Sequence, residues 1–147
     1  MTTAGQLAAT PGTAGRRQRL TAPLVTIGAL AATTVALHVR DPHASGSWGY
    51  CPSRVLFGVS CPGCGGLRAV NDLTHGDLLA AASSNLLFVA SIPLVVWVLG
   101  RWLVGAWTGV PYRPRWVATR AFSVLSLVLL VGFTVLRNIP AGAWLAP

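Results

Sequence analysis

The sequence predicts an all-α integral membrane protein with three transmembrane helices, and with a cysteine-rich interfacial loop and a short helix between the first two. Hydrophobic residues make up 53% of the 147 residues and charged residues only 10%, a composition typical of membrane proteins. Long apolar runs alternate with short segments rich in arginine. All three cysteines lie between the first two runs, so the candidate chemistry is concentrated in one loop.

The first element follows a basic N-terminal segment. Residues 1–19 are rich in Ala, Gly and Thr and end in three arginines, which predicts a disordered tail. Residues 20–39 contain only one ionisable side chain, His38, which we interpret as an interface residue. Twenty helical residues rise roughly 30 Å, the thickness of the hydrocarbon layer. We therefore expect a first transmembrane helix at about 20–39, opening a single membrane domain that covers residues 20–147.

The next segment, residues 40–76, is polar and rich in turn residues, which predicts an interfacial loop. Within it Leu67, Val70 and Leu73 recur at a three-residue spacing, typical of a short helix lying on the bundle. Gly76 is expected to end that helix, and Asp77 to cap the next one through its side-chain oxygen.

Two further membrane helices are predicted, at about 78–104 and 118–137. The second run carries no charge from residue 78 to 100, with Asn85 near its entry and Pro93 expected to kink its middle. An interfacial loop of tryptophans and arginines follows. The third run is only sixteen residues long between Arg120 and Arg137, so it spans the membrane only if those arginines reach toward the headgroups.

The distribution of charge predicts the orientation and the partners. The N-terminal tail and the second loop carry three and four arginines without an acid, whereas all three acids lie in the first loop and its junction with the second helix. The positive-inside rule then places the N-terminus in the cytoplasm and the Cys loop outside the cell membrane. The net charge of +8 favours anionic lipid over nucleic acid, because the arginines flank apolar runs and form no stripe with interleaved aromatics.

Residues 61–65, Cys-Pro-Gly-Cys-Gly, have the pattern of a metal knuckle, in which the chain doubles back and points two thiolates at one ion. Cys51 lies ten residues earlier and is also followed by proline, so it can fold back to the same point. Tetrahedral zinc needs four ligands. The candidates are Cys51, Cys61, Cys64 and, as the fourth, His75, with His43 or water as its substitute.

Two other interpretations of the same cysteines stay open. Cys61 precedes a predicted helix, whose dipole would favour a thiolate there, and Arg68 lies one turn further on. This arrangement is typical of a redox-active dithiol formed by Cys61 and Cys64. Alternatively, two cysteines form a structural disulfide, or all three pack a tight loop as small buried side chains.

Arg137 is expected to pair with Asp72 or Asp77. All three residues are predicted at the same depth, at the outer end of the helices, where a guanidinium gains most by meeting a carboxylate. Such a pair would hold the Cys loop against the bundle.

The ordered set of motifs resembles the bacterial membrane-protein family DUF2752, a domain of unknown function. The residues that carry this resemblance are Cys51-Pro52, Leu56-Phe57-Gly58, Cys61-Pro-Gly-Cys-Gly65, Arg68-Ala69, Gly76-Asp77, Asn85 and Arg137-Asn138. It covers residues 48–104 well and the third helix loosely, with Leu67 where the family usually has Thr and Leu86 where it usually has Pro. The resemblance implies a small integral membrane protein with a cysteine-bearing loop and lends no activity.

The leading hypothesis is a non-enzymatic membrane component. Its loop at residues 51–65 would be held by a metal, zinc above all, or by a disulfide, and it would work through a membrane-protein partner or a second copy of itself. A chain of 147 residues leaves little room for a substrate pocket. The alternative is a membrane thiol-disulfide oxidoreductase that uses Cys61 and Cys64. A transporter or channel subunit is disfavoured, because the runs lack the buried charges that ion pathways show.

Overall fold

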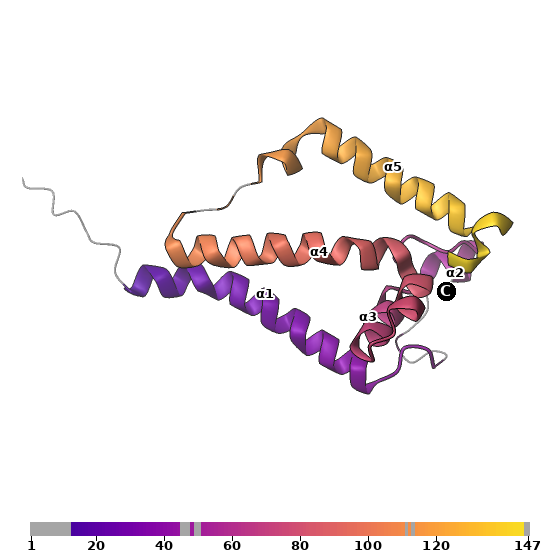
Figure 1. Cartoon of the computed structure of the whole chain (residues 1–147), viewed down its shortest axis with the longest axis horizontal. Helices are drawn as coiled ribbons and strands as arrows, with labels where there is room; N and C mark the ends of the chain where they lie inside the picture. Colours follow the sequence, from indigo (N-terminus) through magenta and orange to yellow (C-terminus); the bar gives the residue numbers. More distant parts are fainter. Residues whose placement is uncertain (1–12, 45–47, 49–50, 111, 113, 146–147) are drawn as a thin grey trace, which may run out of the picture.

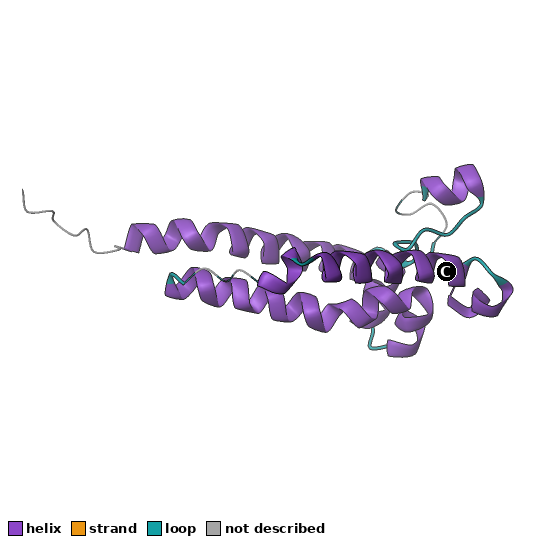
Figure 2. Ribbon diagram, turned by 90° about the horizontal axis from the view of Figure 1, so that it is seen from above, coloured by secondary structure: helices purple, strands orange, loops and turns teal. Residues whose placement is uncertain are grey.

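A computed structural model describes residues 13–44, 48, 51–110, 112 and 114–145, and every regular element among them is helical (Figure 1). In chain order the elements are α1 (Thr13–Val39), α2 (Pro52–Phe57), α3 (Gly66–Thr74), α4 (Leu78–Thr108), the 3₁₀ helix η1 (Arg115–Ala118), α5 (Arg120–Arg137) and the 3₁₀ helix η2 (Pro140–Leu145). Figure 2 shows the same helices from above, joined by short loops. The predicted all-α class is confirmed.

Three of these helices are long and apolar enough to cross a membrane. They are the part of α1 over Gly15–Val39, α4 and α5, with 25, 31 and 18 residues. At 1.5 Å per residue α5 rises about 27 Å and just reaches across the hydrocarbon layer, whereas α4 rises about 46 Å and extends beyond it. Helix α1 begins at Thr13 rather than at residue 20. The rest of the predicted tail, residues 1–12, lies outside the described residues.

The helices are held together mainly at one end of the molecule. Helix α1 packs against α4, and α3 packs against both. Asn71 of α3 donates from Nδ2 to the carbonyl of Leu37 at 2.7 Å, which ties α3 to the end of α1. Helix α5 diverges from α4 along most of its length (Figure 1) and is joined to the others through η2, which contacts both α5 and α4. This end of the bundle carries the Cys loop.

Helix α4 is interrupted at Asn85, which has φ −162° and ψ 91°, a non-helical conformation inside α4. The backbone at Pro93 keeps helical dihedral angles, and the kink expected there stays a prediction. The Asn85 side chain accepts a hydrogen bond from the backbone N–H of Phe88 at 3.0 Å and so caps the second part of the helix. Leu86 is the first residue after this break.

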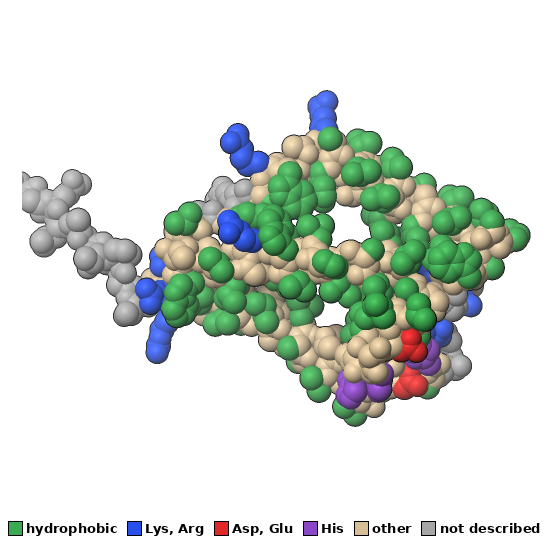
Figure 3. All heavy atoms as spheres, viewed as in Figure 1, with side chains coloured by type: hydrophobic (Ala, Val, Ile, Leu, Met, Phe, Trp, Pro, Cys, Tyr) green, Lys and Arg blue, Asp and Glu red, His purple; other side chains and the backbone are tan. Residues whose placement is uncertain are grey.

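The buried residues are unusually polar for so apolar a chain. Burial is almost confined to the Cys-loop end, where the buried polar side chains are Ser60, Asn71, Asp72, Ser84, Asn85 and Arg137. The apolar side chains of the long helices are mostly exposed, as expected of surfaces that face lipid. In the space-filling view the acidic and histidine side chains gather at this end, whereas most arginines lie at the other (Figure 3). Hydrogen bonds therefore fix this end together with a small number of buried apolar side chains, among them Leu37 and Leu145.

Candidate metal centre

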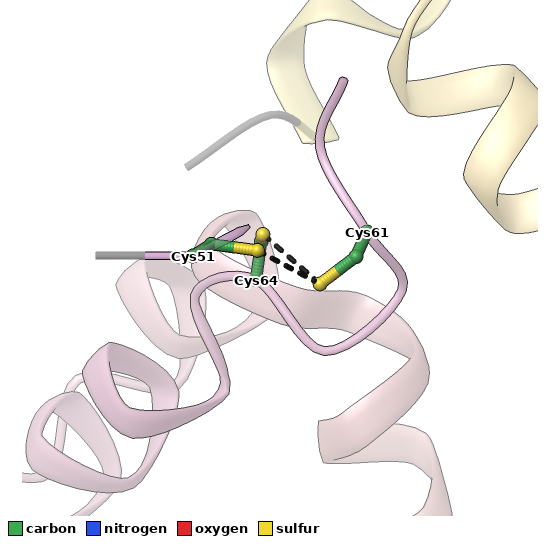
Figure 4. Close-up of side chains that lie close together, drawn as sticks. All are labelled: Cys51, Cys61 and Cys64. Atoms are coloured by element: carbon green, nitrogen blue, oxygen red, sulfur yellow. Dashed lines mark hydrogen bonds between the residues drawn. The ribbon is translucent and has the colours of Figure 1, made fainter. Parts of the chain in front are cut away.

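The three cysteines converge on one point. Cys51 precedes α2, and Cys61 and Cys64 lie in the turn that leads into α3. The Cys61 Sγ lies 3.4 Å from the Cys51 Sγ and 3.1 Å from the Cys64 Sγ, and all three sulfurs lie within 4.8 Å of one another (Figure 4). The predicted clustering of Cys51 with the Cys61–Cys64 turn is confirmed.

The local sequence explains this convergence. Cys51 is the N-cap of α2, with Pro52 in the first turn, where a missing N–H costs nothing. Its carbonyl accepts the N–H groups of Arg54 and Val55, each at 3.1 Å, so α2 starts directly at the cysteine. The second turn closes through the bond from the Cys64 N–H to the Cys61 carbonyl at 3.1 Å. Gly65 follows with φ +79°, a conformation that side chains with a Cβ rarely adopt.

The three sulfurs are close enough together to share one metal ion. All three thiols are free, and their separations of 3.1 and 3.4 Å exceed the roughly 2.05 Å of a disulfide bond. Thiolates around tetrahedral zinc lie about 3.8 Å apart, given Zn–S bonds of about 2.3 Å. Small side-chain movements would bring the three sulfurs to that spacing. The donor set therefore fits a thiolate metal such as zinc.

The thiols differ in acidity. Hydrogen bonds from Ser53, and then from Cys64 and Cys61, lower the pKa of Cys51 from the usual 9 to about 6. Burial raises the pKa of Cys64 to about 12, and its hydrogen bonds to the other two thiols act in the same direction. One sulfur of the cluster thus carries negative charge readily at neutral pH, and the deepest sulfur needs a positive neighbour before it ionises.

Arg137 holds the Cys61–Cys64 turn from the end of α5. Its Nη1 donates to the carbonyls of Cys61 and Cys64, both at 3.0 Å, and its Nη2 donates to the carbonyls of Leu145 at 2.9 Å and Ser84 at 3.4 Å. The side chain is only 2% exposed, and its Nε has no hydrogen-bond partner among the described residues. The expected ion pair with Asp72 or Asp77 is wrong: the guanidinium binds carbonyl oxygens instead.

Two asparagines complete this hold on the loop. Asn85 donates from Nδ2 to the carbonyls of Pro62 at 2.9 Å and Cys64 at 3.1 Å. Asn138 pairs with the backbone of Ser60 in both directions, accepting its N–H at 2.8 Å and donating to its carbonyl at 2.9 Å. We call Asn85, Arg137 and Asn138 the carbonyl clamp. These three side chains reach the cysteine turn from α4 and from the end of α5.

The two candidate acidic partners have other tasks. Buried Asp72 accepts a hydrogen bond from the Ser84 hydroxyl at 2.8 Å and lies 3.3 Å from Nε2 of His43. Asp77 caps α4 by accepting the Ala80 N–H at 2.8 Å, as predicted. Ser84 connects the two systems, because its hydroxyl binds Asp72 while its carbonyl binds Arg137.

The histidines proposed as fourth ligands lie elsewhere. His75, at the far end of α3, stacks on His38 with ring centroids 4.4 Å apart and uses Nδ1 on the Asn71 carbonyl at 2.9 Å. His43 bridges Asp41 and Asp72. The backbone and side-chain hydrogen bonds from His43 lower the pKa of Asp41. Among the described residues only the three cysteines form a group with metal-binding spacing.

Several residues of the site were not singled out from the sequence. Ser60, Ser84 and Leu145 act mainly through backbone groups, which leave no trace in residue type. The usable signal was Ser83-Ser84-Asn85, three successive polar residues in an uncharged and mostly apolar run. Polar side chains at such places usually find a buried partner.

Comparison with protein families gives a match to part of the chain. Searches of curated proteins and of solved structures found none. A family model covers the segment from the first cysteine through most of α4, which includes α3 and Asn85. Residues 51–99 of this chain match DUF2752, described as a protein of unknown function, and the resemblance read from the cysteine motifs is thereby confirmed.

Proposed function

We propose that this protein is a non-enzymatic membrane component built around a structural zinc centre. The thiolates of Cys51, Cys61 and Cys64 hold the ion, and the ion locks the loop across one end of the helices. The main observation in support is that three sulfurs from two separate turns of the chain lie within 4.8 Å of one another. Zinc with soft sulfur ligands in a closed loop typically stabilises a fold rather than acting on a substrate.

Charge balance supports a metal-thiolate centre. The buried guanidinium of Arg137 binds the carbonyls of Cys61 and Cys64 and has no carboxylate among its hydrogen-bond partners in the described chain. An isolated buried charge is costly unless it is compensated. Three thiolates carry one more negative charge than Zn²⁺ carries positive charges, so the loaded centre and Arg137 neutralise each other. Without the metal only a thiolate at Cys51 would supply that charge, because buried Cys64 stays a neutral thiol.

The centre is proposed to face outward from the cell membrane. Most arginines lie at the opposite end of the molecule, which the positive-inside rule assigns to the cytoplasm (Figure 3). The loop, its acids and its histidines then lie at the outer surface.

Metal analysis of the purified protein tests this function. We expect about one zinc per chain, in line with one cluster of three sulfurs, and loss of zinc in Cys51→Ser, Cys61→Ser and Cys64→Ser. Thr33→Ala, on the exposed side of α1, is the matched control and should retain zinc. His75→Ala tests whether His75 is the fourth zinc ligand. If the variant retains zinc, His75 is not a ligand, and if it loses zinc, His75 is one. A wild-type protein without metal that carries a Cys61–Cys64 disulfide would contradict the proposal.

A second candidate function is thiol-disulfide exchange. The Cys61 and Cys64 sulfurs lie 3.1 Å apart ahead of α3, and Cys51 is close enough to act as a third thiol. The two thiols would reduce a substrate disulfide to two thiols and become the Cys61–Cys64 disulfide, so that two electrons and two protons pass to the substrate. A readily reversible disulfide in metal-free wild-type protein would favour this function over the zinc centre.

The protein is proposed to act with another membrane protein or a second copy of itself. Helix α5 stands apart from α4, and most of its large apolar side chains are exposed (Figure 1). Cross-linking in native membranes, followed by mass measurement, distinguishes a homo-oligomer from a mixed complex. A monomer without cross-linked neighbours would contradict this part of the proposal.

A further inference from the structure

A cavity of about 630 Å³, wide open to the surface, lies at the other end of the bundle from the cysteines, between the last turns of α4 and the segment that leads into α5. Its lining combines aromatic rings with two arginines: Trp97, Arg101, Tyr112, Pro114, Arg115 and Trp116. None of these residues takes part in the cysteine centre. The cavity therefore needs an explanation of its own.

The aromatic walls are fixed by contacts with one another. Trp97 meets the edge of Tyr112 at a centroid distance of 5.7 Å and lies 6.4 Å from Trp116, which in turn meets Phe122 at 4.9 Å. The guanidinium of Arg101 lies 5.2 Å from the centre of the Tyr112 ring. The cavity is thus walled by mutually supporting rings, with one arginine already oriented by cation–π attraction.

The backbone around the cavity is also closely packed. Gly105 of α4 is buried, and a Cβ at this position would lie 2.7 Å from the Val110 carbonyl oxygen and 3.1 Å from the Tyr112 nitrogen. Only glycine permits this approach of the loop to the helix. The fold therefore brings Tyr112 against α4 and closes one side of the cavity.

The positive charge of the cavity lining favours an anionic ligand. Arg101 and Arg115 are both exposed on its lining. All three acidic residues of the chain belong to the opposite end of the molecule, where they follow α1, lie in α3 and precede α4, at positions 41, 72 and 77. A ligand with a phosphate group would supply the missing negative charge, and a guanidinium matches phosphate oxygens in geometry as well as charge.

The location points to a lipid as the source of that phosphate. The cavity lies between the end of one membrane-spanning helix at Thr108 and the start of the next at Arg120, so it is at a membrane boundary in either orientation of the protein. Tryptophan and tyrosine favour this level of the bilayer, and basic pockets between transmembrane helices bind anionic headgroups. From this end the apolar surfaces of α4 and α5 lie apart from one another and approach each other only toward the Cys-loop end (Figure 1), which leaves room for acyl chains.

We propose that this cavity binds the headgroup of one anionic phospholipid. Arg101 and Arg115 donate hydrogen bonds to the phosphate oxygens, the rings of Trp97 and Trp116 pack against the glycerol region, and the acyl chains follow the apolar faces of α4 and α5. The site is independent of the cysteine centre and does not depend on its metal.

The test uses the full-length protein in lipid nanodiscs made of phosphatidylcholine with increasing fractions of phosphatidylglycerol, with retained lipid counted by native mass spectrometry. We expect one tightly retained phosphatidylglycerol on the wild type. The double variant R101Q/R115Q should bind it about thirtyfold more weakly, since each arginine near a headgroup contributes about 1 kcal/mol. R120Q, which removes an arginine at the same boundary but outside the cavity, is the matched control and should bind like wild type.

Further arms distinguish the alternatives. Glycerol 3-phosphate and inorganic phosphate should not compete at concentrations that saturate the lipid site; competition by either would make the cavity a soluble-phosphate site and overturn the proposal. Zinc content and helical circular dichroism of R101Q/R115Q should match the wild type, which separates lipid loss from misfolding. If the variant misfolds, the wild-type preference for phosphatidylglycerol over phosphatidylcholine decides alone. Equal retention of the two lipids by the wild type would also overturn the proposal.

Discussion

Arg137 is a buried cation whose hydrogen bonds go to four backbone carbonyls contributed by the cysteine turn, α4 and η2. Arg137→Gln removes the charge and most of the donors, and leaves those carbonyls partly unsatisfied. Losing one partner of a buried ionic arrangement typically costs 3–5 kcal/mol. We therefore expect Arg137→Gln to lower thermal stability by about that amount and to weaken zinc retention, as measured by calorimetry and metal analysis. Arg120→Gln, at the exposed end of the same helix, should change neither.

The same contacts predict that substitutions of Arg137 and Asp77 act independently on stability. Asp77 caps α4 and does not contact Arg137 in the structure. The destabilisations caused by Arg137→Ala and Asp77→Ala should therefore add within about 0.5 kcal/mol in a double-mutant cycle. A coupling energy well above that value would instead support the ion pair that the sequence predicted from the equal depth of the two residues.

The contrast between Cys51 and Cys64 predicts a pH dependence in chelator-treated protein. The lowered pKa of Cys51, about 6, makes it a thiolate above that pH, and its favourable interactions are lost as the pH falls through 6. The raised pKa of Cys64, about 12, keeps it a buried thiol throughout the neutral range. Iodoacetamide at pH 7 should alkylate Cys51 well before Cys64, and Cys51 alkylation should fall off below pH 6. Peptide mass spectrometry measures both, and equal rates for the two cysteines would contradict the assignment.

At the scale of elements, the break in α4 lets Asn85 make two kinds of contact. Its side-chain oxygen caps the second part of α4, and its side-chain nitrogen binds the cysteine turn. Asn85→Asp keeps the oxygen that caps the Phe88 N–H but loses the donor to the carbonyls of Pro62 and Cys64. Unsatisfied buried groups cost about 1–3 kcal/mol each. We expect a loss of about 2–4 kcal/mol in stability, together with reduced zinc retention.

Asn71→Asp is the control for this variant. It also removes an amide donor to a carbonyl, that of Leu37, but away from the cysteine turn. It should lower stability and leave zinc content unchanged. If both variants lose zinc equally, the effect is general destabilisation and not a specific hold on the turn.

The helices were predictable because lipid-facing segments need uninterrupted apolar residues of a set length, and this pattern is local. Their details were not. A proline near the middle of α4 stays within helical geometry, whereas Asn85 breaks it, because the amide can satisfy both the freed N–H and two distant carbonyls. The cysteine cluster, in contrast, could be predicted from the spacing of Cys61 and Cys64. The binding of Arg137 to carbonyls could not, because a sequence shows side-chain charges but not where backbone oxygens point.

At the scale of the whole molecule, the separation of charge predicts topology. We expect the cysteine loop to face outward and the loop at residue 112 to face the cytoplasm, since most arginines lie at that second end (Figure 3). After reduction and chelation of intact cells, an impermeant maleimide should label the native cysteines. A cysteine introduced by Tyr112→Cys should react only once the membrane is opened. The reverse pattern would invert the topology.

The carbonyl clamp also has a consequence for how the chain is made. Its residues Arg137 and Asn138 lie beyond the segment that matches DUF2752 and come from the end of the last membrane helix, whereas the turn they hold is completed more than seventy residues earlier. During synthesis the cysteine turn and α4 leave the ribosome first, and the turn waits with open carbonyls until α5 has been inserted in the correct direction. We therefore expect the loop to close only after α5 is in place, so that a nascent chain halted before residue 120 holds its cysteine turn through Asn85 alone.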